Sequence, residues 1–582
     1  MAKDYIAPIR KNVANFCKSL TNPKRVNNTL FSQNVALDIS KRKPYHISNS
    51  NTIVIGDKDK ISDYIKSNIA QFNASRVIVD LSGDYFKTFA PMLIKQGKRV
   101  YSFNLKEPEY SDFYNPLKYV YDIKGDIDPQ KVDVIVDTIM SFSRERDKTE
   151  IDLTKIDPFW EKTERAFLTG VIYYVLENDD IFAEDKCLYT VLDKIQRLAK
   201  PDSNDKKNKE LMLTKEIKEF VKKMEMQGKD VKTFLYYNTF LIAPEKTRST
   251  VINCTIVDLR DFNDKKISNI LTTNCCCHDK NIDFEELAKT ETYVFVKFSP
   301  SNICHKMLFQ MFFSQLISTL YDYGEYIFGD KWCLYKDFGI PVINPFDSQE
   351  DAIACQNDLT TDNIITLPYN CSYPYDKNKK IYYLVWNNII LKKSFSKKYL
   401  EWIVKNIKKF PIKQINQFGY LALPMPVEIF LDDFGLYNFM YDLDIIEATA
   451  TRYRIGITFF APSIEIIKEM TANRVQTRYG HSEVFAGIIA NNDNIIYLGS
   501  KIPFDIDFMQ KWIGKNKKGL IMDEDDIRNL QYDEVIVSIR DIPTIVDKRL
   551  LFKQHPAYKR IEKIKDTKSI EGYFVNKRNF LI

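Results

Sequence analysis

The sequence contains little glycine and no long apolar run. Only 18 of its 582 residues are glycine, the residue type on which phosphate-binding loops depend. No stretch approaches the roughly 18 uncharged apolar residues of a membrane-spanning helix. Residues 1–17 are interrupted by charge and proline, unlike a secretory signal peptide. We therefore expect a cytoplasmic protein that reaches the inner face of the cell membrane only through partners.

Disulfide-like cysteine spacing is also missing. The ten cysteines are scattered, which is typical of a reducing cytoplasm. The run Cys275–His278, together with Cys304 and His305, invites comparison with zinc sites. Adjacent cysteine side chains diverge, however, and zinc sites favour two to four residues between cysteines. We expect no zinc and interpret these cysteines mainly as small buried apolar residues.

The positive charge is concentrated at the two ends of the chain. The net charge is +6 overall, but residues 1–50 carry nine Lys or Arg against two acids and residues 541–582 carry ten against five. Such ends can bind nucleic acid or an acidic membrane face. No aromatic-basic platform of the kind that binds single strands accompanies them. We interpret them as solvated termini, with DNA binding as the alternative.

Short β-branched runs recur along the chain, most of them followed by a helical pattern. Several are apolar nearly throughout, as strands covered on both faces are. Alternation of such strands with helices predicts an α/β fold with a mostly parallel central sheet. The expected strands are 52–56, 76–81, 99–105, 292–298, 427–434, 456–462, 494–499 and 534–539.

Two stretches interrupt this alternation. Residues 180–275 have a charged helical pattern, which predicts an inserted all-α subdomain. Residues 330–420 are rich in Tyr, Asn and Pro and contain both strand-like and helix-like pieces, which predicts an extra α+β insertion. The expected organisation is a lead-in segment 1–50, the nucleotide-binding-type core 51–179, the all-α subdomain 180–275, core 276–329, the insertion 330–420, core 421–545 and a basic segment 546–582.

Seven segments, in this order, resemble the TraG/TraD-type coupling proteins of type IV secretion systems. The similarity covers nearly the whole chain outside 330–420, and IFLDDF takes the Walker B place. The segments are NPKRVNNTLFSQNVALDI (22–39), VIVDLSGDYFKTFAPMLIKQGKRVYSFNLKEPEYSDFYNPLKYV (77–120), DPFWEKTERAFLTGVIYYVLEN (157–178), APEKTRST (243–250), IFLDDF (429–434), NNDNIIYLG (491–499) and LLFKQHPAYKR (550–560).

The resemblance implies a RecA-like P-loop NTPase core. In that family the core is an ATPase, usually a membrane-anchored hexamer, that feeds DNA or protein into a secretion channel. Expected partners are channel components or the relaxosome, DNA, and an active paralogue or further copies of this chain. The sequence lacks the family's N-terminal membrane spans, so we do not expect it to anchor itself.

The candidate phosphate loop departs from the P-loop pattern. That pattern, G-x-x-x-x-G-K-[ST], places glycine amides around phosphate, a lysine on its charge and a hydroxyl on Mg²⁺. Gly56 is followed by DKDKIS (57–62), so isoleucine takes the second glycine position. Gly56, Lys60 and Ser62 are the candidate nucleotide-binding residues, in a shortened loop.

Two aspartates make this loop a poor phosphate site. Carboxylates about 4 Å from a triphosphate cost on the order of a few kcal/mol near a surface. We interpret the segment as an ordinary turn into a helix that Asp57 or Asp59 caps. A cryptic phosphate site is the alternative.

The Walker B position and two further places also depart from the family. Asp432 stands where the metal-ordering Asp belongs and would hold Mg²⁺ only if nucleotide binds, while Asp433 replaces the family's Glu. The shorter Asp433 would hold its carboxylate about 1 Å short of an attacking water. Asp80–Asp84 lacks the family's lysine, and Pro462 replaces a Gln that senses phosphate.

Two arginines, Arg452 and Arg454, are candidate arginine fingers acting across a subunit boundary. Their alignment with the family is imperfect, and surface or strand-flanking positions are the simpler interpretation. The four departures above together predict a pseudo-ATPase that acts in substrate recruitment or assembly, with no cofactor. The alternative is an ATP-driven DNA translocase with a divergent loop, which would use ATP and Mg²⁺.

Overall fold

The computed structural model divides by its internal contacts into two compact units. The first comprises Met1–Val100, Phe284–Lys297 and Leu320–Ile582, and the second Tyr101–Asp283 and Phe298–Thr319. The structure describes residues 28–38, 49–71, 74–146, 158–201, 210–273, 280–328, 331–337, 340–368, 380–394, 396–414, 423–436, 440, 443–472, 484–516, 519–540, 542–549 and 551–564. Residues 1–27 and 39–48 of the lead-in segment and 565–582 of the basic segment lie outside this description.

A nine-stranded sheet in the order β19-β18-β15-β3-β14-β13-β4-β6-β5 belongs to the first unit, apart from Tyr101–Asn104 of its edge strand β5. From β15 to β6 every neighbouring pair is parallel, whereas β15/β18 and β18/β19 are antiparallel. The strands are β3 (Thr52–Ile55), β4 (Ser75–Val79), β5 (Arg99–Asn104), β6 (Thr292–Lys297), β13 (Val427–Leu431), β14 (Ile455–Ala461), β15 (Asn494–Tyr497), β18 (Glu534–Ile539) and β19 (Ile542–Lys548).

The central strands are buried along their full length. Every residue of β3, β4, β13, β14 and β15 is buried, as expected of parallel strands covered on both faces. All eight expected strands are present, and the predicted α/β class with a mostly parallel sheet is confirmed.

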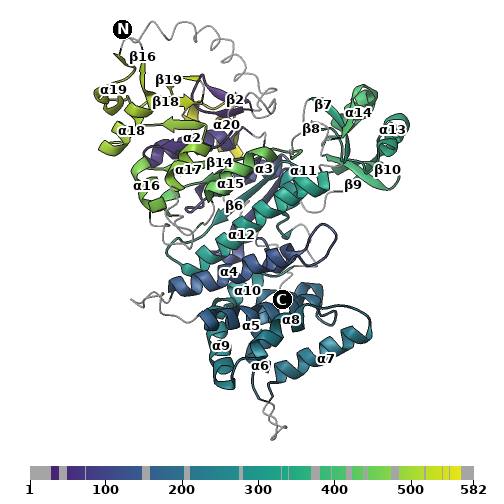
Figure 1. Ribbon diagram of the computed structural model, residues 1–582. Helices are drawn as coiled ribbons and strands as arrows, with labels where there is room; N and C mark the ends of the chain where they lie inside the picture. Colours follow the sequence, from purple (N-terminus) through teal and green to yellow (C-terminus); the bar gives the residue numbers. More distant parts are fainter. Residues whose placement is uncertain are drawn as a thin grey trace. The chain divides into compact units, whose positions relative to one another are not determined.

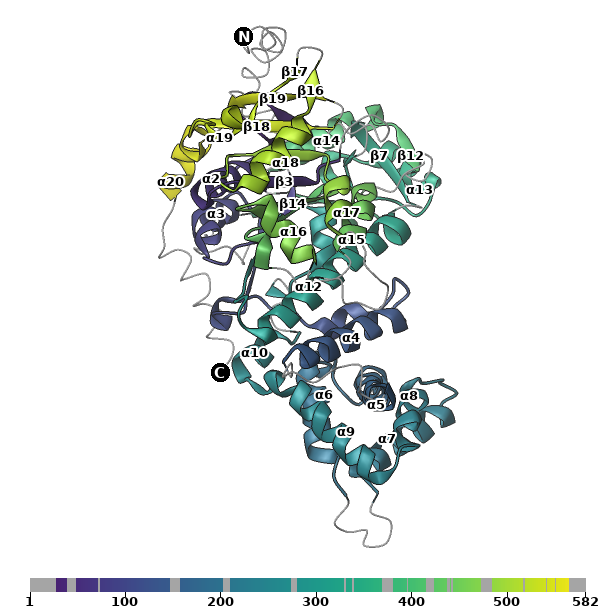
Figure 2. The ribbon, with the colours of Figure 1, turned by 60° about the vertical axis from the view of Figure 1, so that its left-hand side comes forward.

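Helices pack on both faces of this sheet. Ile65 of α2 (Lys58–Ile69), Phe89 of α3 (Asp84–Lys95) and Ile561 of α20 (Tyr558–Ile564) share one hydrophobic cluster with Val54 and Phe460. A second group of helices consists of α15 (Leu443–Ala450), α16 (Ile464–Ala472) and α17 (Val484–Asn491). Of these, α15 and α16 contact β14, and α17 contacts both α15 and α16. Figures 1 and 2 show α2 and α3 in purple, α20 in yellow and the helices α15, α16 and α17 in green.

The second unit is built mainly from helices. Between residues 180 and 273 the described residues form helices and turns without a named strand, which confirms the predicted all-α subdomain. Nowhere in the described chain does a helix combine the length and apolarity that a bilayer crossing requires. The main helices are α4 (Pro129–Arg146), α5 (Pro158–Glu177), α6 (Leu188–Leu198), α7 (Met212–Met226), α8 (Thr233–Leu241), α9 (Glu245–Asp258), α10 (Lys265–Ile270) and α12 (Ile303–Asp322), of which α12 ends in the first unit.

The predicted α+β insertion is present between residues 331 and 414. It has two three-stranded sheets, β11-β10-β9 and β12-β7-β8, and its own hydrophobic cluster around Leu334, Leu384, Trp386 and Leu400. Its elements are β7 (Trp332–Asp337), β8 (Ile340–Pro341), α13 (Gln349–Asp358), β9 (Ile364–Pro368), β10 (Lys380–Trp386), β11 (Ile389–Ser394), α14 (Lys397–Asn406) and β12 (Ile412–Gln414).

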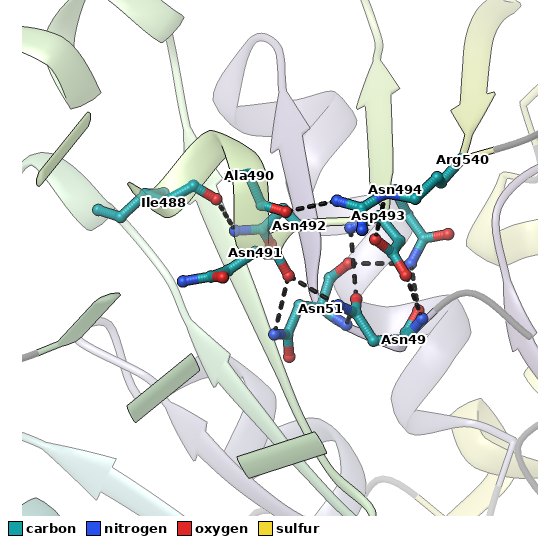
Figure 3. A network of polar contacts seen from close by, with 9 residues as sticks. All are labelled: Asn49, Asn51, Ile488, Ala490, Asn491, Asn492, Asp493, Asn494 and Arg540. Atoms are coloured by element: carbon teal, nitrogen blue, oxygen red, sulfur yellow. Dashed lines mark hydrogen bonds and ion pairs between the residues drawn. The ribbon is translucent and has the colours of Figure 1, made fainter. Parts of the chain in front are cut away.

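A network of asparagines joins the strands where they begin, at the amino edge of the sheet (Figure 3). Asn51 Oδ1 accepts a hydrogen bond of 3.0 Å from Ile457 N, and its Nδ2 donates to the carbonyl of Asn491 at 3.1 Å. Asn494 Nδ2 donates to the carbonyls of Asn49 and Asn51 at 2.8 and 2.9 Å. These bonds satisfy backbone groups that the sheet leaves unpaired at this edge.

Candidate nucleotide site at the carboxyl edge of the sheet

Gly56 follows β3 at the opposite, carboxyl edge of the sheet and is closely packed. A Cβ atom at this position would lie 2.7 Å from Leu498 Cβ, which is closer than real Cβ contacts allow. The chain also continues its strand pairing at this point, since Gly56 N donates to Ala461 O at 3.2 Å and Leu498 N to Ile55 O at 2.7 Å. Packing against β15 is therefore sufficient to explain this glycine.

Asp57 and Asp59 lie at the start of α2, where sequence analysis places a cap. Asp57 occupies the N-cap position with extended backbone, but its side chain makes no capping hydrogen bond. Asp59 lies in the first helical turn, where a negative charge is favourable beside the helix dipole.

Lys60 is buried, with 8% of its surface exposed. Its Nζ donates to the carbonyl of Leu498 at 2.7 Å, lies 3.8 Å from Asp57 Oδ2 and lies 5.4 Å from the centre of the Tyr532 ring. Burial lowers the pKa of Lys60, while the nearby Asp57 carboxylate raises it. The ammonium group therefore bonds to the end of β15.

Ser62 and Asp432 are brought together through a third residue, Tyr85. The Tyr85 hydroxyl donates to Asp432 Oδ2 at 3.2 Å and is also hydrogen-bonded to the Ser62 side chain. Tyr85 is buried near the start of α3, with 5% of its surface exposed. In a P-loop site the serine hydroxyl and this carboxylate face the same Mg²⁺. The phenol hydroxyl bridges the two groups in this chain.

Asp432 directly follows β13 and has a carboxyl group of perturbed pKa. Burial and the neighbouring Asp433 raise the pKa of Asp432 to about 6, against the hydrogen bond from Tyr85 that lowers it. Its Oδ1 accepts a hydrogen bond of 3.0 Å from Asp433 N. The more distant Asp80 carboxylate adds to the rise.

Asp433 itself adopts a left-handed backbone conformation, with φ at 53°. Among non-glycine residues Asp and Asn tolerate this conformation best. Its carboxylate lies 3.9 Å from Lys58 Nζ, and both side chains are solvent-exposed to a substantial degree. Such a pair contributes little to stability. The start of α2 and the end of β13 are nevertheless neighbours, so the structure brings the two candidate halves of the site together.

The turn after β4 is held by Asp80. This buried carboxylate accepts hydrogen bonds from Gly83 N and Phe86 N, both at 2.8 Å, and from Ser82 Oγ at 3.2 Å. Burial raises the pKa of Asp80, and these three donors oppose the rise. Gly83 has a φ of 82°, which glycine adopts without strain. The segment therefore caps α3 and positions Tyr85.

Pro462 follows β14 and is exposed. The buried Asp505 carboxylate lies just beyond it, where Oδ1 accepts from Ser463 Oγ at 2.9 Å and from Ile464 N at 3.0 Å. These bonds satisfy the first amides of α16. The described groups at this strand end are used in capping.

The two candidate arginine fingers lie at the other edge of the sheet. Arg454 immediately precedes β14, and its Nη1 donates to the carbonyl of Leu423 at 3.1 Å. It is 8% exposed and has a φ of 62°. Arg452 is exposed on the preceding turn. The structure therefore does not bring either arginine to Gly56 or Asp432 of the same chain.

The cysteine and histidine run falls largely outside the described residues, which omit 274–279 and thus Cys275–His278. Cys304 is buried, and His305 Nδ1 accepts a hydrogen bond of 3.1 Å from Ser299 N. Burial and Lys106 lower the pKa of His305. In the described part of the chain no group of three or more His, Cys, Asp or Glu residues has the geometry of a metal site.

Comparison with known proteins supports the resemblance. Residues 62–329 match the family model described as type IV secretory system conjugative DNA transfer. Among curated proteins no match was found.

Several solved structures are remotely similar. The bacterial conjugative coupling protein TrwBdeltaN70, in a trigonal form with sulphate, has a TM-score of 0.47 at 9% identity, covering 92% of both chains. Its unbound monoclinic form has a TM-score of 0.43 at 9% identity, covering 94% of both chains. The plasmid coupling protein TrwB with ADP and Mg²⁺ has a TM-score of 0.42 at 9% identity, covering 86% of both chains.

Proposed function

Because residues 62–329 match the family model of type IV secretory system conjugative DNA transfer proteins, we propose that this chain acts in such an apparatus as a coupling-protein-like component that does not hydrolyse ATP. It recruits the transferred substrate or supports assembly. Its partners are channel components or the relaxosome, DNA, and an active paralogue or further copies of this chain. It works in the cytoplasm, beside those partners.

One observation carries the absence of hydrolysis. The Tyr85 hydroxyl bridges Ser62 and Asp432, the two groups that would share Mg²⁺ in a P-loop enzyme. Lys60 supports the same conclusion, because its ammonium is bonded to Leu498 O. As they stand, these residues do not fit a magnesium-bound nucleotide, so we derive no catalytic step from them.

A second candidate function, an ATP-driven DNA translocase, has one specific observation in its favour. Asp432 directly follows a buried strand beside the start of α2, and its pKa of about 6 is the kind of perturbation that functional sites exhibit. This function requires Tyr85 to leave Asp432 and Lys60 to turn toward the loop. We regard it as the weaker candidate for that reason.

Titration of the protein with a fluorescent ATP analogue separates the two functions. The proposed function predicts no magnesium-dependent binding in the wild type and no change in Asp432→Ala. Micromolar binding that requires Mg²⁺ and is lost in Asp432→Ala would establish the translocase instead. Glu465→Ala, on the partly buried first turn of α16, is the control for a lost carboxylate.

A further inference from the structure

A small cavity lies beside α2 and is lined by buried polar groups. It offers about 10 Å³ to the centre of a water-sized sphere, close to the smallest space that holds one water molecule. Lys60 and Ser67, which share one face of α2, line it together with Arg549. All three are at least nine-tenths buried.

Two of the three guanidinium nitrogens of Arg549 lack hydrogen-bond acceptors among the described residues at this cavity. Its Nε donates to Tyr532 O at 2.8 Å, and its guanidinium carbon lies 4.2 Å from the centre of the Tyr532 ring. Within the described residues Nη1 and Nη2 have no hydrogen-bond partner. Asp63 Oδ2 is 3.6 Å from Nη1, beyond hydrogen-bond distance. Leaving these two guanidinium nitrogens buried without acceptors is costly.

Two more donors converge on the same space. The Ser67 hydroxyl also has no partner in the described part of the chain. Lys60 Nζ donates a hydrogen bond to Leu498 O, and an ammonium group has three donors. Arg549 lowers the pKa of Lys60 by charge repulsion, so the two cations are close enough to repel each other. Asp57, at 3.8 Å from Lys60, is largely exposed to solvent.

We propose that this cavity binds one small monovalent anion of chloride size between Arg549, Lys60 and Ser67. Such an ion accepts from several donors at once and offsets the repulsion between two buried cations. Polyatomic anions such as phosphate are too large for the space. The site ties Lys60 of α2 to Arg549, which follows β19, independently of whether a nucleotide binds at Gly56.

Crystals of the full-length protein grown with sodium bromide at tens of millimolar test the site directly. Anomalous scattering should place bromide in the cavity lined by Arg549 and Ser67. Density that fits only water, or a bromide peak that requires molar salt, would overturn the proposal.

Thermal unfolding provides the measurement in solution. At matched ionic strength, sodium chloride should raise the melting temperature over sodium gluconate by about 2–4 °C, because the ion binds only the folded state. This difference in melting temperature should vanish in Arg549→Gln and become smaller in Ser67→Ala. Ser67→Ala is the milder substitution and serves as the test if Arg549→Gln does not fold. Lys548→Gln removes a neighbouring exposed cation and should keep the full difference. Equal melting temperatures in the two salts would contradict the site.

Discussion

The Tyr85 hydroxyl is placed by its surroundings with little freedom. Gly83 and Asp80 fix the turn before α3, and the ring is 5% exposed. Burial raises the pKa of Tyr85 far above its ordinary value, so the phenol keeps its proton and can donate to Asp432. A metal ion that binds Asp432 has to displace this neutral donor.

The charge on Asp432 should destabilise the fold at neutral pH. Its pKa is about 6 in the folded protein against an ordinary value of 3.8, so the folded state binds the proton more tightly and stability falls as pH rises from about 4 to 6. We predict that Asp432→Asn stabilises the protein by on the order of 2 kcal/mol at pH 7 and by almost nothing at pH 4. Urea unfolding at both pH values measures this. Destabilisation at pH 7 would contradict the assignment.

Removing the Tyr85 hydroxyl should raise the pKa of Asp432 further. The hydrogen bond from Tyr85 favours the ionised carboxylate, and Tyr85→Phe deletes that bond while keeping the ring. Carbon-13 NMR of the labelled Asp432 carboxyl follows its titration. Tyr189→Phe, in the second unit and 42% exposed, serves as the control. A pKa that is unchanged or lower in Tyr85→Phe would mean that the bridge does not exist.

At the level of elements, the strands were predictable because burial on both faces leaves runs that only apolar residues satisfy. The run 534–539 is of this kind, whereas β19 (Ile542–Lys548) is an antiparallel edge strand of mixed pattern and was not predicted. The closeness of the start of α2 to Asp432 was predictable from the order of the family's motifs. The direction in which the Lys60 side chain points was not predictable, because it depends on Leu498, some 440 residues later in the chain.

Tyr85 also escaped sequence analysis, although a signal was available. It follows the predicted strand 76–81 by four residues, and the ends of neighbouring parallel strands meet at one edge of a sheet. Any side chain with a hydroxyl in that turn was therefore a candidate neighbour of Asp432. Motif comparison directed attention to the missing lysine in Asp80–Asp84 instead.

The asparagine network should hold the amino edge of the sheet together. Asn51→Ala leaves the buried Ile457 N without its acceptor, and an unsatisfied buried donor costs about 1–3 kcal/mol. We predict a loss of about 2–3 kcal/mol in the free energy of unfolding, measured by urea denaturation. Asn529→Ala, at an exposed helix end, should cost less than 0.5 kcal/mol, roughly as at ordinary surface sites. Equal losses of unfolding free energy in the two variants would show that the network does not stabilise the fold.

The inserted segment 331–414 should respond to core substitutions on its own. Leu384 is fully buried in the cluster of this segment, and Leu→Ala in a core costs about 2–5 kcal/mol. We predict that Leu384→Ala increases amide hydrogen exchange in β9, β10 and β11 and leaves β3 and β14 unchanged. Ile390→Ala, at a 48% exposed position of β11, should leave hydrogen exchange unchanged in all of these strands. Faster exchange in β3 would show that the two regions unfold together.

At the scale of the whole molecule, the two units are interleaved in sequence. The first unit collects Met1–Val100, Phe284–Lys297 and Leu320–Ile582, so β3 near the start of the chain pairs with β14 and β15 some 400 residues later. Such long-range pairing is slow to form. The carboxyl edge of the sheet is therefore assembled from distant segments, and its polar groups take the partners that this assembly provides.

The central claim is that those partners exclude a magnesium-bound nucleotide. It is tested most directly by crystallising the protein with Mg²⁺ and a non-hydrolysable ATP analogue in large excess. We predict that the Tyr85 hydroxyl stays between Ser62 and Asp432, that Lys60 stays on Leu498 O, and that no triphosphate binds at the start of α2. A triphosphate wrapped by the amides after Gly56, with Mg²⁺ bound to Ser62 and Asp432, would contradict the account.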